Sequence, residues 1–134
     1  MDAARLEQVR LRMTLAREKL AVARELFGNR HFNDTVSKAY YAMFHASRAL
    51  LLAVGEDPHK HAGVVSLFGE RFVKPGLTAA RFGRTLAIAQ RLRETSDYDE
   101  YKHATQDEAQ QAIQDAADFI REAERILNRL LSGE

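Results

Sequence analysis

Residues 39–54, AYYAMFHASRALLLAV, form the most apolar stretch of the chain, and their spacing decides the fold. One stripe recurs every three to four residues, as on one face of a helix: Tyr40, Met43, Ser47 and Leu50. A second stripe runs beside it at the same spacing: Tyr41, His45, Arg48 and Leu52. A helix that is apolar on two sides packs on both of them. We therefore expect the second stripe to be a homodimer or partner face, the alternative being a catalytic role for Tyr41 and His45.

Outward from this stretch, the same periodicity predicts five helices. They cover about residues 2–27, 34–54, 59–73, 78–98 and 105–130. Asn33 or Asp34 and Thr78 are the expected caps of the second and fourth helices, and Thr105 with Glu108 reads as a capping box. In the fourth helix we expect Ile88 to point inward. The sequence thus predicts one all-α domain over residues 1–134, a four-helix up-and-down bundle with one additional short helix.

The composition excludes several classes of function. Hydrophobic residues make up 46% of the 134 and charged residues 29%, as in a soluble globular protein. Without cysteine the chain has no disulfide, thiolate metal site or cysteine nucleophile. His59 and His61 form an isolated H-x-H, which lacks the further ligands of a closed metal site. No signal peptide or membrane span is visible, so we expect a cytoplasmic protein with no membrane contact, metal or cofactor.

Charge is unevenly distributed, although the net charge is only +1. Residues 71–93 hold six basic side chains and no acid, whereas residues 94–124 hold ten acids against Lys102 and Arg121. Such a boundary serves a phosphate-bearing ligand, or it lets helices or subunits pair through solvated salt bridges.

The stretch RLRETSDYDEYKH, residues 91–103, lies at this boundary. Arg93 and Asp97 are four residues apart and can pair on one helix face. An arginine beside a tyrosine, here Tyr98, is also a means of holding a phosphate and stacking on a base. No glycine-rich phosphate loop or HExxH motif accompanies them.

Two motifs together resemble the HEPN domain family: AYYAMFHASRALLLAVGEDPHKHAGVVSLFGERFVKPGL, and the later RLRETSDY with its R-x-x-x-D-Y pattern. The resemblance covers about residues 16–127. It implies a compact bundle that often dimerises and is commonly paired with a minimal nucleotidyltransferase in a toxin–antitoxin system. Many such domains are metal-independent ribonucleases whose motif is an arginine, four to six residues and then a histidine. In some pairs the partner attaches AMP to a tyrosine two residues beyond that histidine.

The chain departs from the ribonuclease motif. From Arg93 the histidine would fall at residues 98–100, and from Arg91 at residues 96–98, and none of these is His. His103 lies ten residues after Arg93, too far along the chain for this motif. A neutral imidazole can take a 2′-hydroxyl proton near pH 7, whereas a tyrosine with a pKa of about 10 cannot do so readily.

The function expected is therefore a partner of a nucleotidyltransferase that binds nucleotide or RNA, and not an enzyme. The expected binding residues are Arg81, Arg84, Arg91, Arg93, Asp97 and Tyr98. Among them Arg93, Asp97 and Tyr98 are the only candidates for catalysis, and Tyr98 or Tyr101 is the candidate for nucleotidylation. The alternatives are a ribonuclease toxin with a degenerate motif and a purely structural helical interaction module.

Overall fold

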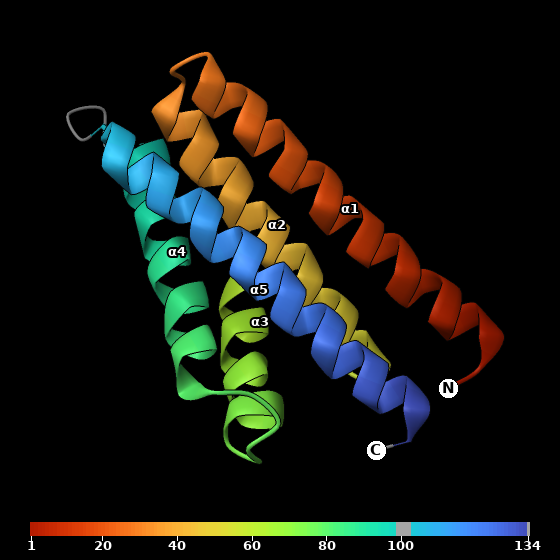
Figure 1. Ribbon diagram of the computed structural model, residues 1–134. Coiled ribbons are helices and arrows are strands. Elements are labelled where there is room, and N and C mark those ends of the chain that lie inside the picture. Colours follow the sequence, from red (N-terminus) through yellow and green to blue (C-terminus); the bar gives the residue numbers. More distant parts are fainter. Residues whose placement is uncertain (99–102, 134) are drawn as a thin grey trace.

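The computed structural model describes residues 1–98 and 103–133, apart from the side chains of residues 96–98, and this part of the chain contains helices and no strand (Figure 1). The elements in chain order are α1 (Ala3–Gly28), α2 (Phe32–Ala53), α3 (His61–Phe68), the π-helical turn η1 (Gly69–Val73), α4 (Ala80–Tyr98) and α5 (Gln106–Ser132). The four long helices and the short α3 confirm the predicted all-α bundle.

Helix α2 is the centre of the bundle, because it packs against α1, α3, α4 and α5. In Figure 1, α1, α2 and α5 run side by side, whereas α4 runs away from α5 toward α3. Helices α1 and α2 pack against each other, and both bury alanines, whose small side chains let neighbouring backbones approach closely. The fully buried alanines of the two helices are Ala16, Ala23, Ala39, Ala42, Ala46 and Ala49.

Larger side chains fill the other half of the core, where α3, η1 and α4 meet α5. Phe68 and Phe72 pack at 5.6 Å between ring centroids, and Phe68 lies 5.2 Å from Phe119 of α5. Leu86 of α4 is fully buried among them. This aromatic layer fixes α3, and with it His61 at the first turn of α3, against the bundle.

Two predicted helix starts are wrong, because polar side chains there have tertiary partners. Helix α2 begins at Phe32, and neither Asn33 nor Asp34 caps it; Asn33 Oδ1 instead accepts a hydrogen bond of 2.5 Å from the Ala104 amide. Helix α4 begins at Ala80, because the buried Thr78 donates its hydroxyl to Glu122 of α5. Each polar group joins two segments that are far apart in sequence.

Of three other predicted features, one is confirmed and two are corrected. The capping box of α5 is present, with the Glu108 amide donating to Thr105 Oγ1 at 3.1 Å and the Thr105 amide donating to Glu108 at 3.0 Å. The third helix starts at His61 and widens into η1 after Phe68. Ile88, predicted to face inward, is 54% exposed. Helix α4 therefore has an outer apolar position.

No helix in the described part of the chain is long and apolar enough to cross a bilayer.

Candidate functional site

Three helices bring an arginine, a histidine and a tyrosine together at one place in the bundle. The Tyr40 hydroxyl of α2 lies 2.6 Å from Nδ1 of His61, at the first turn of α3. The Arg93 guanidinium of α4 lies over the Tyr40 ring, 5.3 Å from its centroid, and 5.7 Å from that of Tyr41. Arg93 is only 7% exposed, so its charge is held against the aromatic faces and away from bulk water.

Aromatic rings fix the orientation of the His61 imidazole. It stacks on Phe44 with 4.3 Å between centroids and 20° between planes, and Tyr41 meets it edge-on at 5.8 Å. Tyr40 packs against it at 5.7 Å in addition to its hydrogen bond. Since His61 is held on three sides and remains partly exposed, it is an oriented imidazole that a ligand can reach.

The protonation of this cluster suits proton transfer. Burial lowers the pKa of His61 and the charge of Arg93 lowers it further, while Glu94 acts in the opposite direction and Arg48 adds to the lowering. Burial raises the pKa of Tyr40, so its phenol keeps its proton and can orient the imidazole. In the tautomer in which Nδ1 donates to the Tyr40 oxygen, Nε2 carries a lone pair and can accept a proton.

The second stripe of α2 continues this surface. Tyr41, His45, Arg48 and Leu52 are all half-buried. Burial lowers the pKa of His45 to about 4, and the positive charges of Lys19 and Arg48 contribute. The stripe is therefore a mixed aromatic and basic strip beside His61, the composition by which proteins bind single-stranded nucleic acid.

An ion cluster sits at the far end of that strip. Arg12 of α1 and Arg48 of α2 both bind Asp57, at 3.1 and 3.2 Å. Partial burial acts to raise the pKa of Asp57, but the hydrogen bonds and charges of Arg48 and Arg12 outweigh it and hold the pKa below its ordinary value. Two arginines sharing one carboxylate leave a net positive charge.

The structure separates the residues expected to bind nucleotide or RNA. Arg93 belongs to the cluster, whereas Arg81, Arg84 and Arg91 are exposed along α4. Arg81 stacks on the Phe82 ring at 4.0 Å, twelve residues and therefore about 18 Å along the helix from Arg93.

The side chains of Asp97 and Tyr98, like the whole of Tyr101, lie outside the described residues. The expected pair of Arg93 with Asp97 and the nucleotidylation sites therefore remain predictions. In the described segments, no three histidine, aspartate or glutamate side chains gather as metal ligands would. His61, one half of the H-x-H pair considered above as a metal site, instead faces Tyr40 and Phe44.

Sequence reasoning missed Tyr40 and His61 as members of the site. Tyr40 was assigned to the core stripe, which it does occupy, and nothing in helical spacing shows that its hydroxyl reaches another helix. The sequence places His61 both in an H-x-H pair and at the start of the third helix, predicted over about residues 59–73, but nothing in it pairs His61 with Tyr40.

Comparison with known proteins places this chain in a family. The family model described as HEPN domain matches residues 9–126, which include every member of the cluster. This chain belongs to the HEPN domain family. A relative from Methanocaldococcus jannaschii, named Putative toxin MJ0605, is 37% identical over 125 residues, covering 93% of this chain and 92% of the relative.

Two other relatives of the HEPN chain are similar over most of their length. The UPF0332 protein glr0978 of Gloeobacter violaceus is 37% identical over 116 residues, 86% of this chain and 92% of the relative. A second Methanocaldococcus jannaschii protein, Putative toxin MJ0142, is 28% identical over 121 residues, 89% of this chain and 82% of the relative. The resemblance drawn from YYAMFHA and R-x-x-x-D-Y is thus confirmed, and two of these relatives carry the name of a putative toxin.

Proposed function

We propose that this HEPN protein binds single-stranded RNA at the His61 cluster and cleaves it without a metal, as the toxin of a two-component pair. The observation that carries the proposal is the contact of the Tyr40 hydroxyl with His61, beneath the charge of Arg93. The missing motif histidine was the reason to expect a binding protein and not an enzyme. His61 supplies an imidazole from another helix, and this favours the ribonuclease alternative.

The chemistry follows from the roles available to the three side chains. Nε2 of His61 takes the proton of a ribose 2′-hydroxyl, and the 2′-oxygen forms a bond to the adjacent phosphorus. The bond from phosphorus to the 5′-oxygen breaks, that oxygen takes a proton from water, and the His61 imidazolium gives its proton to the hydroxide that remains, which regenerates the base. Arg93 stabilises the charge that develops on the phosphoryl oxygens. The products are a 2′,3′-cyclic phosphate and a 5′-hydroxyl.

Binding of the RNA strand is assigned to the strip on α2. Tyr41 offers a ring for a base, while Arg48 and Arg12 attract the backbone. Nucleotide binding at the same strip follows from the same chemistry, because a mononucleotide presents one base and one phosphate.

A metal-free cleavage assay tests the proposal. Wild type, incubated with a fluorescent single-stranded RNA in excess chelator, is expected to yield 2′,3′-cyclic phosphate ends. His61→Gln and Arg93→Lys are expected to lose at least a hundredfold in rate, since each removes one chemical role. His59→Gln is the matched control, because His59 is an exposed histidine two residues away. Intact RNA with wild type, or full activity in His61→Gln, contradicts the proposal.

The partner proposed for this toxin is a minimal nucleotidyltransferase, with the HEPN chain acting as a homodimer. The toxin-named relatives support a partner of some kind, and the family resemblance supplies its class. Incubation with ATP and a nucleotidyltransferase encoded by a neighbouring gene is expected to add one AMP to Tyr98 or Tyr101. Peptide mass spectrometry of Tyr98→Phe and Tyr101→Phe identifies the acceptor. An unmodified chain, or AMP on another residue, contradicts this assignment.

A further inference from the structure

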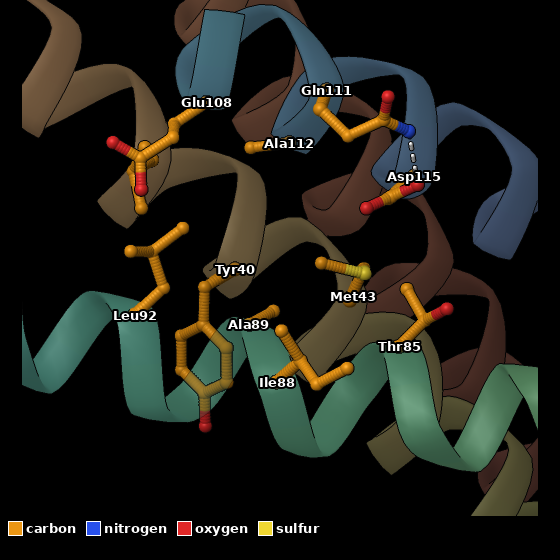
Figure 2. A pocket seen from close by; sticks show the side chains of 11 residues that line it. Tyr40, Met43, Thr85, Ile88, Ala89, Leu92, Glu108, Gln111, Ala112 and Asp115 are labelled. Carbon is orange, nitrogen blue, oxygen red and sulfur yellow. Dashed lines mark hydrogen bonds between the residues drawn. The ribbon is translucent and has the colours of Figure 1, made fainter. Parts of the chain in front are cut away.

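A groove of about 160 Å³ lies between α4 and α5, with α2 beneath it (Figure 2). Its floor is made by three buried side chains of α2: Val36, Tyr40 and Met43. Two turns of α4 and two turns of α5 form the walls, through Thr85, Ile88, Ala89 and Leu92 on one side and Glu108, Gln111, Ala112 and Asp115 on the other. Ile88 is 54% exposed, so the apolar wall continues to the mouth of the groove, where a ligand can enter from solvent.

The volume of the groove limits its occupant to a small molecule. A cavity of about 150 Å³ holds one benzene molecule, so the groove has room for one aromatic ring or an aliphatic body of similar size. A partner helix that lies in a groove inserts a row of apolar side chains, spaced as i, i+4 and i+7, and needs more space than one ring. The groove is therefore too small for a protein segment of this kind.

The charge of the groove selects a cation. Glu108 and Asp115 are half-buried in its α5 wall, seven residues or about 10.5 Å apart. Figure 2 shows the two carboxylates at opposite ends of the groove. No lining residue is basic, and within the described part of the chain neither carboxylate forms a salt bridge. A phosphate or another anion would face both negative charges beside an apolar floor, and it is excluded.

Asp115 is the better placed of the two to bind a cation. It accepts a hydrogen bond of 2.9 Å from Nε2 of Gln111, a neutral and exposed side chain of its own helix (Figure 2). Glu108 already accepts the Thr105 amide in the capping box of α5. An ammonium group can take the place of the Gln111 amide and bring a positive charge to Asp115, whereas at Glu108 it would compete with a helix cap.

We propose that the groove between α4 and α5 binds a small primary amine with an aromatic or compact aliphatic body. The body lies on Tyr40 and Met43 between the two walls, and the ammonium pairs with Asp115. The ring of Tyr40 lines the groove while its hydroxyl reaches His61, 2.6 Å away. The ligand therefore contacts the side chain that orients the imidazole, which makes it an effector of the cluster. The binding site goes beyond the proposed function, and only the effect on RNA cleavage rests on it.

Isothermal titration calorimetry on the full chain tests the site, with 2-phenylethylamine as the probe. Wild type is expected to bind it with a Kd of about 1 mM or tighter, as suits a ligand of this size. The uncharged 2-phenylethanol is expected to bind about tenfold more weakly, and the anion phenylacetate not at all. Asp115→Asn is expected to lose about tenfold in affinity for the amine and to keep its affinity for the alcohol. Asp118→Asn, on the same helix but outside the groove, is the matched control.

A second variant tests the apolar part of the site. Ala112→Leu fills the groove from its α5 wall and is expected to abolish binding of the amine and of the alcohol alike. Circular dichroism verifies that each variant is folded. Wild type that binds none of the three probes at about 10 mM overturns the inference, and so does a folded Ala112→Leu protein with full affinity. Full affinity of Asp115→Asn for the amine overturns the assignment of the counter-ion.

RNA cleavage by wild type saturated with 2-phenylethylamine tests the effector role. The rate is expected to change in wild type and to stay the same in Ala112→Leu, which keeps His61 and lacks the binding site. An unchanged wild-type rate at saturation overturns the effector role. Failure of the two proposals is distinguishable, because intact RNA without any probe counts against the ribonuclease alone, whereas calorimetry decides the binding site without RNA.

Discussion

The Tyr40 hydroxyl and His61 Nδ1 lie 2.6 Å apart, although the two residues stand on different helices and 21 positions apart in the chain. For this contact the chain must turn back after the end of α2, so that the first residue of α3 lies beside the middle of α2. Phe68 and Phe72 hold α3 there by packing into the core. The histidine of this site is thus positioned by tertiary packing and not by spacing from Arg93.

Tyr40→Phe keeps the ring and removes the hydroxyl that orients His61. We expect stability to fall by about 1 kcal/mol, the usual value of one such hydrogen bond. RNA cleavage is expected to fall by about tenfold, while RNA affinity changes little, since the strip is untouched. Urea denaturation and single-turnover kinetics measure the two effects. Unchanged cleavage in a folded Tyr40→Phe protein would show that His61 needs no orientation by this tyrosine.

His45 is expected to make the fold sensitive to acid. Its pKa is about 4 in the folded protein and about 6.5 in the unfolded chain, so the unfolded state takes up the proton first as pH falls. The contribution of neutral His45 to the free energy of unfolding is fully present above pH 6.5. It is lost between pH 6.5 and 4, by roughly 1–3 kcal/mol. Thermal melts of His45→Gln are expected to decline less over this range. Parallel pH curves for the two proteins would contradict this role.

Ala46→Leu tests the close approach of α1 and α2. Ala46 is fully buried in the core cluster that holds residues of both helices, so a larger side chain there must displace packed neighbours. We expect destabilisation of about 1–3 kcal/mol by overpacking. Leu11→Ala on the exposed face of α1 is the control and is expected to change stability little. Equal stability of Ala46→Leu and wild type would mean that the two helices can move apart freely.

Thr78 and Glu122 join the start of α4 to α5, and Thr78→Val removes the donor. The Glu122 carboxylate then keeps Arg125, whose hydrogen bonds of 2.7 and 2.8 Å hold the pKa of Glu122 below its usual range. We expect a loss of about 1–2 kcal/mol in chemical denaturation. Thr95→Val is the control, since the Thr95 hydroxyl only returns to the Arg91 carbonyl of its own helix. A loss of equal size in both variants would contradict the tertiary role of Thr78.

The bundle could be predicted because helical periodicity reports on local geometry, and the stripe of Tyr40, Met43, Ser47 and Leu50 is buried as predicted. The capping box at Thr105 has the same local origin. Ile88 and Thr78 could not be predicted, because their environments depend on how far α4 lies from α5. Sequence spacing carries no such distance.

The candidate site shows the same division. Arg93 was identified from the motif, whereas His61 and Tyr40 meet only in three dimensions. The sequence favours the α2 strip as a homodimer or partner face, whereas the proposed function assigns the RNA strand to it. Charge and periodicity identify surfaces, but the shape between helices decides what fits them.

The most direct test of the account is the pH dependence of RNA cleavage by wild type and by His61→Gln in excess chelator. Since the pKa of His61 lies below 6.5, the wild-type rate is expected to rise with pH, to level off before neutrality and to stay constant through pH 8. His61→Gln is expected to show a residual rate at least a hundredfold lower with no inflection in that range. A variant that cleaves at the wild-type rate, with the same inflection, would contradict the assignment of His61 as the general base.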